Sequence, residues 1–260
     1  MTSTAPEKTL RNIRIVIEYD GTRYLGWQQQ LDGPSIQAAL MDAVFAITGE
    51  RPHVQAAGRT DAGVHAFAQV ANFQVTSRIP GEKFAPALNV NLPADINVHV
   101  SEDVPMAFNS RHDSVSKRYR YRVYNARERA GLEANRAWHV RFPLDLDAMR
   151  AATVQLIGEH DFESFRSAQC DAEHARRFMH AITVASTPRP PSGAFVDITF
   201  HANAFCRHMC RILAGTLVEV GLGRRPGDMH AILQARDRST GGITAPPSGL
   251  TLLEVLFEGG

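Results

Sequence analysis

The chain has little cysteine and no long apolar run. Its 260 residues include three cysteines, and so few thiols, odd in number, argue against a disulfide framework and favour a reducing compartment. No apolar stretch approaches the roughly 20 residues that a membrane helix needs. A charged start followed by an apolar signal core is also lacking. We therefore expect a cytoplasmic protein with no membrane attachment.

Motifs for cofactors and metals are also lacking. The sequence has no phosphate-binding glycine loop followed by Lys and Ser or Thr, and no dinucleotide fingerprint. Cys206, His208 and Cys210 suggest a metal site. At 100° per residue, however, His208 would lie roughly 200° around a helix from Cys206, and no second ligand pair has zinc spacing. We expect no metal and no nucleotide cofactor, and interpret the cysteines as packing residues.

Net charge is small, but it is unevenly distributed. The formal charge is +1, with 8 basic against 11 acidic residues in 1–110 and 20 against 16 in 111–260. The basic excess concentrates in 111–130, which includes Arg118, Arg120 and Arg122. Such a segment could bind a polyanion. A solvated basic strand face is the alternative, and charge alone favours that alternative.

Hydrophobic periodicity predicts interleaved strands and helices in both halves of the chain. Alternating residues predict strands near 12–19, 52–57, 67–75, 96–100, 117–124, 178–185, 194–201 and 250–257. Helical spacing predicts helices at 36–48, 82–89, 149–157, 205–220 and 227–235, the first capped by Ser35 and ended by Gly49. We therefore expect an α+β protein with a disordered tail at 1–11, an N-terminal lobe at 12–110 and a C-terminal lobe at 111–260.

The segment from Gly58 to His65 presents one carboxylate in a glycine-bounded turn. Asp61 there is a candidate nucleophile or base. A structural turn aspartate is the alternative, since Asp readily accepts hydrogen bonds from the next backbone amides. Small residues around it would allow a ligand to approach the backbone closely, and Arg59 could meet a phosphate.

Three further segments carry residues suited to RNA. Tyrosines and arginines alternate in 117–124, which offers stacking planes and phosphate contacts, or alternatively a plain amphipathic strand. The loop at 18–30 is rich in aromatic and amide side chains and contains Arg23 and Trp27. Helical spacing places Arg207 and Arg211 on one face, with His208 beside Arg211.

Taken together, these segments resemble the tRNA pseudouridine synthase A family. The resemblance covers nearly the whole chain from about residue 12 to 257, and the Gly-Arg-Thr-Asp-Ala-Gly-Val-His segment at 58–65 is highly specific to the family. The matching blocks, in the family's order, are 18–30, 58–65, 89–96, 117–125, 202–211 and Gly249-Leu250. Residues 171–178 depart from the pattern, since the proline often found before the arginine is missing and the loop is slightly shorter.

The resemblance implies a two-lobed fold with antiparallel sheets flanked by helices, acting as a homodimer without cofactor or metal. It implies conversion of uridine to pseudouridine at positions 38 to 40 of the tRNA anticodon stem-loop, with extrusion of the target base. Residue by residue, it makes Asp61 the essential aspartate, Tyr119 the ring against the target base and Arg211 the basic partner of the aspartate. Arg59 would lie beside the flipped nucleotide. We expect Arg23, Trp27, Arg207 and His208 to contact the RNA as well.

Two other classes of function remain as alternatives. An RNA-binding module that has lost its chemistry would not need Asp61, Tyr119 and Arg211 together. A carboxylate-dependent nucleoside hydrolase would need a second well-placed carboxylate, and would leave the basic strand unexplained. The leading hypothesis is therefore an isomerase that modifies tRNA.

Overall fold

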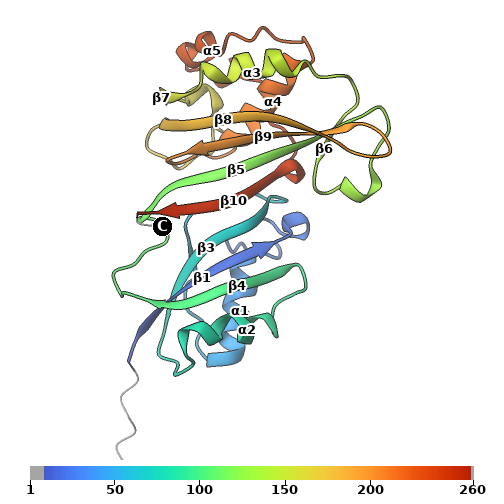
Figure 1. Ribbon diagram of the computed structural model, residues 1–260. Helices are drawn as coiled ribbons and strands as arrows, with labels where there is room; N and C mark the ends of the chain where they lie inside the picture. The colour runs from blue at the N-terminus through green and yellow to red at the C-terminus, as the bar shows by residue number, and fades with distance from the viewer. Residues whose placement is uncertain (1–8, 259–260) are drawn as a thin grey trace, which may run out of the picture. The chain divides into compact units, whose positions relative to one another are not determined.

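The computed structural model describes residues 9–258, in two compact units (Figure 1). Of the described residues, one unit comprises 9–114 together with 257–258, and the other comprises Val115–Leu256. Most of the expected disordered tail, residues 1–8, lies outside the described residues. Arg11, at the end of that expected tail, already begins the first strand.

The N-terminal unit is built on an antiparallel sheet in the order β4-β1-β3, with β2 paired to β3. Its strands and helices are β1 (Arg11–Tyr19), α1 (Ile36–Thr48), β2 (Gln55–Ala56), β3 (His65–Val75), α2 (Phe84–Asn89) and β4 (Ile96–Val104). Register is anchored where Ile15 lies opposite both Ala71 and Ser101. The two helices lie against this sheet, whose strands run from blue (β1) to green (β4) in Figure 1.

Local sequence explains why these elements form. Alternate residues of β1 are apolar and fully buried, so that strand directs one face into the core. The Ser35 side chain accepts the Ala38 amide at the start of α1, and Gly49 ends that helix in the left-handed conformation. Phe73 of β3 meets Phe84 of α2 edge-on, with ring centroids 5.6 Å apart. The predicted strand at 12–19 and the predicted helix at 36–48 are confirmed as β1 and α1.

The C-terminal unit contains the strand order β10-β5-β9-β8-β7, with β6 pairing in parallel with β5. Its strands and helices are β5 (Ser114–Asn125), β6 (Trp138–Val140), α3 (Leu146–Val154), β7 (Gly158–Asp161), β8 (Arg176–Pro188), β9 (Ala194–Ala202), α4 (Met209–Gly221), α5 (Met229–Ala235) and β10 (Leu250–Phe257). The α+β class and the hairpin of β8 and β9 are confirmed. The two short strands β6 and β7 were not predicted.

The core of this unit lies between the sheet and its helices. Tyr121 and Phe200, from β5 and β9, and Leu213 of α4 are fully buried. Alternation therefore places Tyr119 and Tyr121 of β5 inward and its arginines on the opposite face, which Tyr124 shares. None of the helices in the part of the chain that the structure describes has the length and apolar character of a membrane span.

Candidate active site

Asp61 occupies the first position of a tight turn. The Val64 amide donates to the Asp61 carbonyl oxygen at 3.2 Å, and Gly63 adopts φ +77°. A left-handed residue at the third position is typical of a type II turn, and glycine adopts it without steric cost. The Asp61 side chain is half-buried and Arg59 is exposed. The Asp61 carboxylate therefore lies in the connection between β2 and β3, on a turn of defined shape just before β3 begins.

A second segment, residues 20–27, buttresses the back of this turn. Trp27 donates its amide to the Thr60 carbonyl oxygen at 3.0 Å, and the Gly63 amide donates to the carbonyl of Tyr24 at 3.3 Å. Gly26 has φ +96°, and a Cβ placed there would lie 2.5 Å from the Thr60 oxygen. Only glycine allows the two backbones to approach this closely. The Gly21-to-Trp27 loop is thus a rigid support for Asp61.

Buried hydrogen bonds fix the residues just before the aspartate. The Tyr19 hydroxyl and the Thr60 hydroxyl are 2.8 Å apart, and Gln69 Nε2 donates to the Gly58 carbonyl at 2.8 Å. Burial raises the pKa of Tyr19 to about 12, against weaker lowering by these polar neighbours. The phenol therefore stays protonated at neutral pH. These supports were not singled out from the sequence, because nothing in their spacing links strand β1 to the turn.

His65, which follows the turn, also contacts the supporting segment 20–27. Its ring is buried, with Nδ1 3.1 Å from an Asp20 carboxylate oxygen and 3.2 Å from the Gly21 amide nitrogen. A Cβ on Gly21 would meet the Val64 carbonyl oxygen at 1.9 Å. His65 therefore ties the beginning of the supporting loop to the end of the aspartate turn.

Two predicted RNA contacts in the supporting loop have structural partners within the N-terminal unit. Trp27 is only 2% exposed and packs near Tyr19, with centroids 6.3 Å apart. Arg23 forms an ion pair with Asp95 at 2.6 Å, although its side chain remains largely exposed. The Asp95 carboxylate also accepts the Tyr24 hydroxyl at 2.7 Å. The structure thus shows Trp27 as a supporting residue and leaves Arg23 accessible at the surface.

Tyr119 and Arg211 lie in the C-terminal unit. The Tyr119 ring on β5 is nearly buried and meets Phe205 edge-on, with centroids 5.2 Å apart. Strand pairing places Tyr119 opposite Phe200. The neighbouring inward residue, Tyr121, donates its hydroxyl to the Pro246 carbonyl at 2.8 Å. Burial raises the Tyr121 pKa and the nearby Arg211 guanidinium lowers it, so this cation lies among the inward-facing rings of β5.

The Arg211 side chain is clamped to a distant loop. Its Nε donates to the Ala245 carbonyl at 2.8 Å, and the Ala245 amide donates back to the Arg211 carbonyl at 3.1 Å. This pair of bonds joins the first turn of α4 to residues 34 positions further along the chain. These two bonds fix where the Arg211 guanidinium stands relative to the loop before β10.

The predicted helical relation between Arg207, His208 and Arg211 is wrong. Helix α4 begins at Met209, because His208 adopts the left-handed conformation with φ 63° and ends the non-helical segment that precedes it. Arg207 is exposed and donates from its guanidinium to the Gln169 carbonyl at 3.1 Å. A residue in this conformation is uncommon unless it is glycine. Arg207 and Arg211 therefore do not share a helix face.

Acidic partners face the arginines of β5. Arg122 makes two hydrogen bonds to Asp197, at 2.8 and 2.7 Å, and Arg120 lies 4.0 Å from the same carboxylate. Arg118 forms an ion pair with Glu254. These contacts favour the amphipathic-strand interpretation over a phosphate-binding stripe.

The three cysteines are free thiols, and Cys206 and Cys210 are buried. Among the described residues, no three His, Cys, Asp or Glu side chains are grouped as a metal site would require.

Comparison with known proteins identifies the family. The family model described as tRNA pseudouridine synthase matches residues 15–113 and 152–258. The tRNA pseudouridine synthase A of Myxococcus xanthus is 46% identical over 249 residues, covering 95% of this chain and 92% of the relative. Those of Geotalea daltonii and Thermoanaerobacter sp. are 41% and 39% identical over 249 residues, covering 95% of this chain and 100% of each relative.

The chain therefore belongs to the tRNA pseudouridine synthase family. It is an isomerase that acts on tRNA, and the resemblance read from its sequence motifs is confirmed.

Proposed function

We propose that this isomerase converts uridine to pseudouridine at positions 38 to 40 of the tRNA anticodon stem-loop, with Asp61 as its essential carboxylate. The observation that carries the proposal is the turn itself. Asp61 stands first in a type II turn whose backbone is held by Trp27, Tyr24 and the Tyr19–Thr60 bond. Such support matters because a catalytic group must be held within a fraction of an ångström of its productive position.

The reaction needs no exchange of atoms beyond a proton. The bond from ribose C1′ to uracil N1 breaks, the uracil turns, C1′ bonds to C5, the C5 proton leaves to solvent, and N1 takes up a proton. The Asp61 carboxylate supports this either as a nucleophile, through a covalent adduct, or as a base, through a glycal-like intermediate. Both routes use the same ionised side chain, so both predict loss of activity when the charge is removed.

We assign supporting roles to residues of both units. Tyr119 would lie against the extruded uracil and hold it during rotation, while Arg211 would support the charge on the aspartate. Arg59, Arg23, Arg207 and His208 would contact the RNA backbone around the extruded nucleotide. Trp27 contributes indirectly, by holding the Thr60 carbonyl.

Tritium release from tRNA labelled at uridine C5 tests the proposal. We expect release by the wild type, none by Asp61→Asn, and normal release by the control Asp32→Asn, which removes an exposed charge of the same unit. Binding of tRNA by Asp61→Asn should persist. Binding without release by the wild type would instead indicate an RNA-binding module, and free uracil as the product would indicate a hydrolase.

Arg211 is tested separately. Arg211→Ala should lose most of the activity with little loss of tRNA affinity, because its proposed role is exercised in the reaction. Equal losses of activity and affinity would show that Arg211 mainly contacts phosphate.

We also propose a cytoplasmic homodimer. Three free thiols suit a reducing compartment, and the substrate is a tRNA. Light scattering should give about twice the 28.6 kDa chain mass, and a mass equal to one chain would contradict the dimer.

A further inference from the structure

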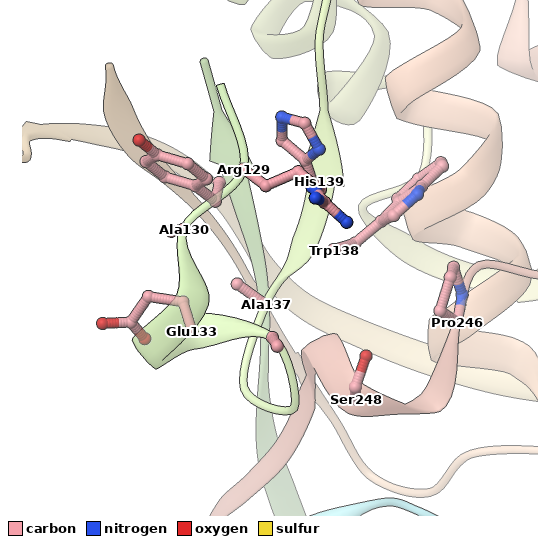
Figure 2. A pocket seen from close by; sticks show the side chains of 10 residues that line it. Arg129, Ala130, Glu133, Ala137, Trp138, His139, Pro246 and Ser248 are labelled. Atoms are coloured by element: carbon pink, nitrogen blue, oxygen red, sulfur yellow. The ribbon is translucent and has the colours of Figure 1, made fainter. Parts of the chain in front are cut away.

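The C-terminal unit contains a cavity that none of the proposed catalytic residues line. Its volume is about 330 Å³, near the lower end for small-ligand sites. Two segments far apart in sequence form its walls, one running from the end of β5 into β6 and one just before β10 (Figure 2). The lining residues are Tyr124, Arg129, Ala130, Glu133, Ala134, Ala137, Trp138, His139, Pro246 and Ser248.

Neighbouring contacts hold the walls in place. Tyr124 stacks on His139 with centroids 5.8 Å apart, and Trp138 meets Tyr121 edge-on at 6.2 Å. The opposite wall is fixed because the Pro246 carbonyl accepts the Tyr121 hydroxyl at 2.8 Å. The aromatic surfaces of the cavity are thus largely preorganised.

Several polar groups at the cavity have unused hydrogen-bonding capacity. Within residues 9–258, the Arg129 guanidinium, the Trp138 indole N–H and the Ser248 hydroxyl make no hydrogen bond or ion pair. His139 Nε2 lies 2.8 Å from the Ala126 carbonyl, which can only accept, so Nε2 carries a proton. Nδ1 is then an acceptor in the neutral ring.

The charge at the cavity favours an anion. Figure 2 shows the Arg129 side chain extending toward Trp138 and His139, whereas the Glu133 carboxylate points away from them. Glu133 also has a basic neighbour, Arg189, at 4.0 Å. The remaining unbalanced charge among the lining residues is therefore the Arg129 cation.

We propose that this cavity binds one nucleotide of the tRNA substrate, separate from the uridine that is isomerised. The base would contact the rings of Trp138 and His139, and its phosphate would bind Arg129. Aromatic walls, one cation and unused donors are the chemistry with which proteins hold an unstacked nucleotide. The inference rests on tRNA as the substrate, which also supplies a use for part of the basic excess of 111–130.

Paired variants of the full-length protein test this site. Arg129→Ala should raise the Kd for a tRNA transcript by about fivefold or more, with kcat at saturating tRNA unchanged. The matched control is Arg127→Ala, which removes an equal charge two residues away, from a side chain that does not line the cavity and lies near Glu128. Its Kd should change less than about twofold. Equal weakening by both variants would overturn the site, since it would show only general attraction.

Cross-linking of the protein to the same tRNA with short-wavelength ultraviolet light locates the contact. We expect an RNA adduct on the peptide that contains Trp138 and His139, reduced in Arg129→Ala. A second experiment measures binding of adenosine monophosphate to the wild type and to Arg129→Ala. If adenosine monophosphate binds at micromolar concentration and needs Arg129 while tRNA affinity does not, the cavity holds a free nucleotide and the proposal is wrong.

Two further measurements distinguish the nucleotide site from a dimer interface and from the isomerase proposal. A drop from dimer to monomer in Arg129→Ala would make the cavity an interface between copies, and would overturn the nucleotide site. Binding and cross-linking need no turnover, so they can be measured in Asp61→Asn. A tRNA effect of Arg129 would therefore stand even if the protein released no tritium, and failure of the site would leave the isomerase proposal intact.

Discussion

At the scale of single residues, the position of Asp61 depends on how closely one backbone can approach another. Gly26 allows residues 24–27 to lie directly against Thr60 and Asp61. That contact is encoded by the absence of a side chain. It explains why a loop distant in sequence can control where the carboxylate stands.

Gly26→Ala should therefore impair both stability and activity. An alanine at φ +96° with its Cβ 2.5 Å from the Thr60 oxygen must displace the aspartate turn. We expect a loss of about 2–4 kcal/mol in urea unfolding, and a fall in tritium release. Gly49→Ala is the control, since Gly49 also has positive φ but a Cβ there would meet nothing within 4 Å. It should cost about 1 kcal/mol and spare activity. Equal effects on activity would contradict the buttress.

Cys206 should be chemically inert in the folded protein. Burial raises the pKa of its thiol to about 11, so about one thiol in a thousand is ionised at pH 8. Iodoacetamide at pH 8 should label Cys206 slowly in native protein and rapidly in urea, as followed by mass spectrometry. The half-buried Cys170 serves as the internal comparison. Labelling of native Cys206 at its unfolded rate would refute the assignment.

At the scale of elements, strand β5 combines two roles on its two faces. Tyr119 and Tyr121 face the core, and Tyr121 also anchors the loop that clamps Arg211. Its arginines meet acids on neighbouring strands. The alternation of tyrosine and arginine that suggested RNA binding is thus equally explained by contacts that stabilise the sheet.

Arg122→Ala separates these two roles. Because Arg122 and Asp197 are both largely shielded from solvent, its removal should cost about 1–3 kcal/mol of folding stability. We expect the slope of log Kd for tRNA against log salt to stay the same, with Asp197→Asn behaving similarly. A slope reduced by about 1 in Arg122→Ala alone would identify a phosphate contact.

Sequence predicted those elements whose signals are local. Ser35 and Gly49 bound α1 through their own chemistry, and the glycines around Asp61 mark its turn. Strands β6 and β7 were missed because three or four residues carry too little periodicity. The start of α4 was misplaced because His208, in a left-handed conformation, interrupts a pattern that looks continuous in sequence.

The supports of the candidate site were invisible for a different reason. Arg211 and Ala245 are 34 positions apart, and Tyr19 and Thr60 are 41 apart. Neither pair has a spacing that signals contact. Such bonds are dictated by tertiary packing, so sequence could name the aspartate and the arginine but not what holds them.

At the scale of the whole molecule, acid stability has an identifiable contributor. Arg11 donates to both Asp103 oxygens, at 2.8 and 2.7 Å, and these bonds, more than its charge, lower the Asp103 pKa below its usual range. A carboxyl with a lowered folded pKa adds stability above its unfolded pKa. That contribution is lost as pH falls through the lower folded value.

Asp103→Asn should therefore flatten the acid limb of the stability curve. Between pH 5 and pH 3, wild type should lose more unfolding free energy than the variant, as measured by urea unfolding at each pH. The difference should stay below about 1 kcal/mol, because the Asp103 side chain is 51% exposed. Parallel curves for the two proteins would contradict the assignment.

Phe257 belongs to the N-terminal unit, although all of Val115–Leu256 precedes it. Its ring lies 5.6 Å from that of Phe108, and the Arg14 guanidinium carbon lies 6.0 Å from its centroid. During translation, Arg14 and Phe108 are synthesised long before Phe257 is added. The half of the enzyme that emerges first is consequently finished last, and a stalled or shortened nascent chain would leave its aspartate-bearing half with an uncovered aromatic surface.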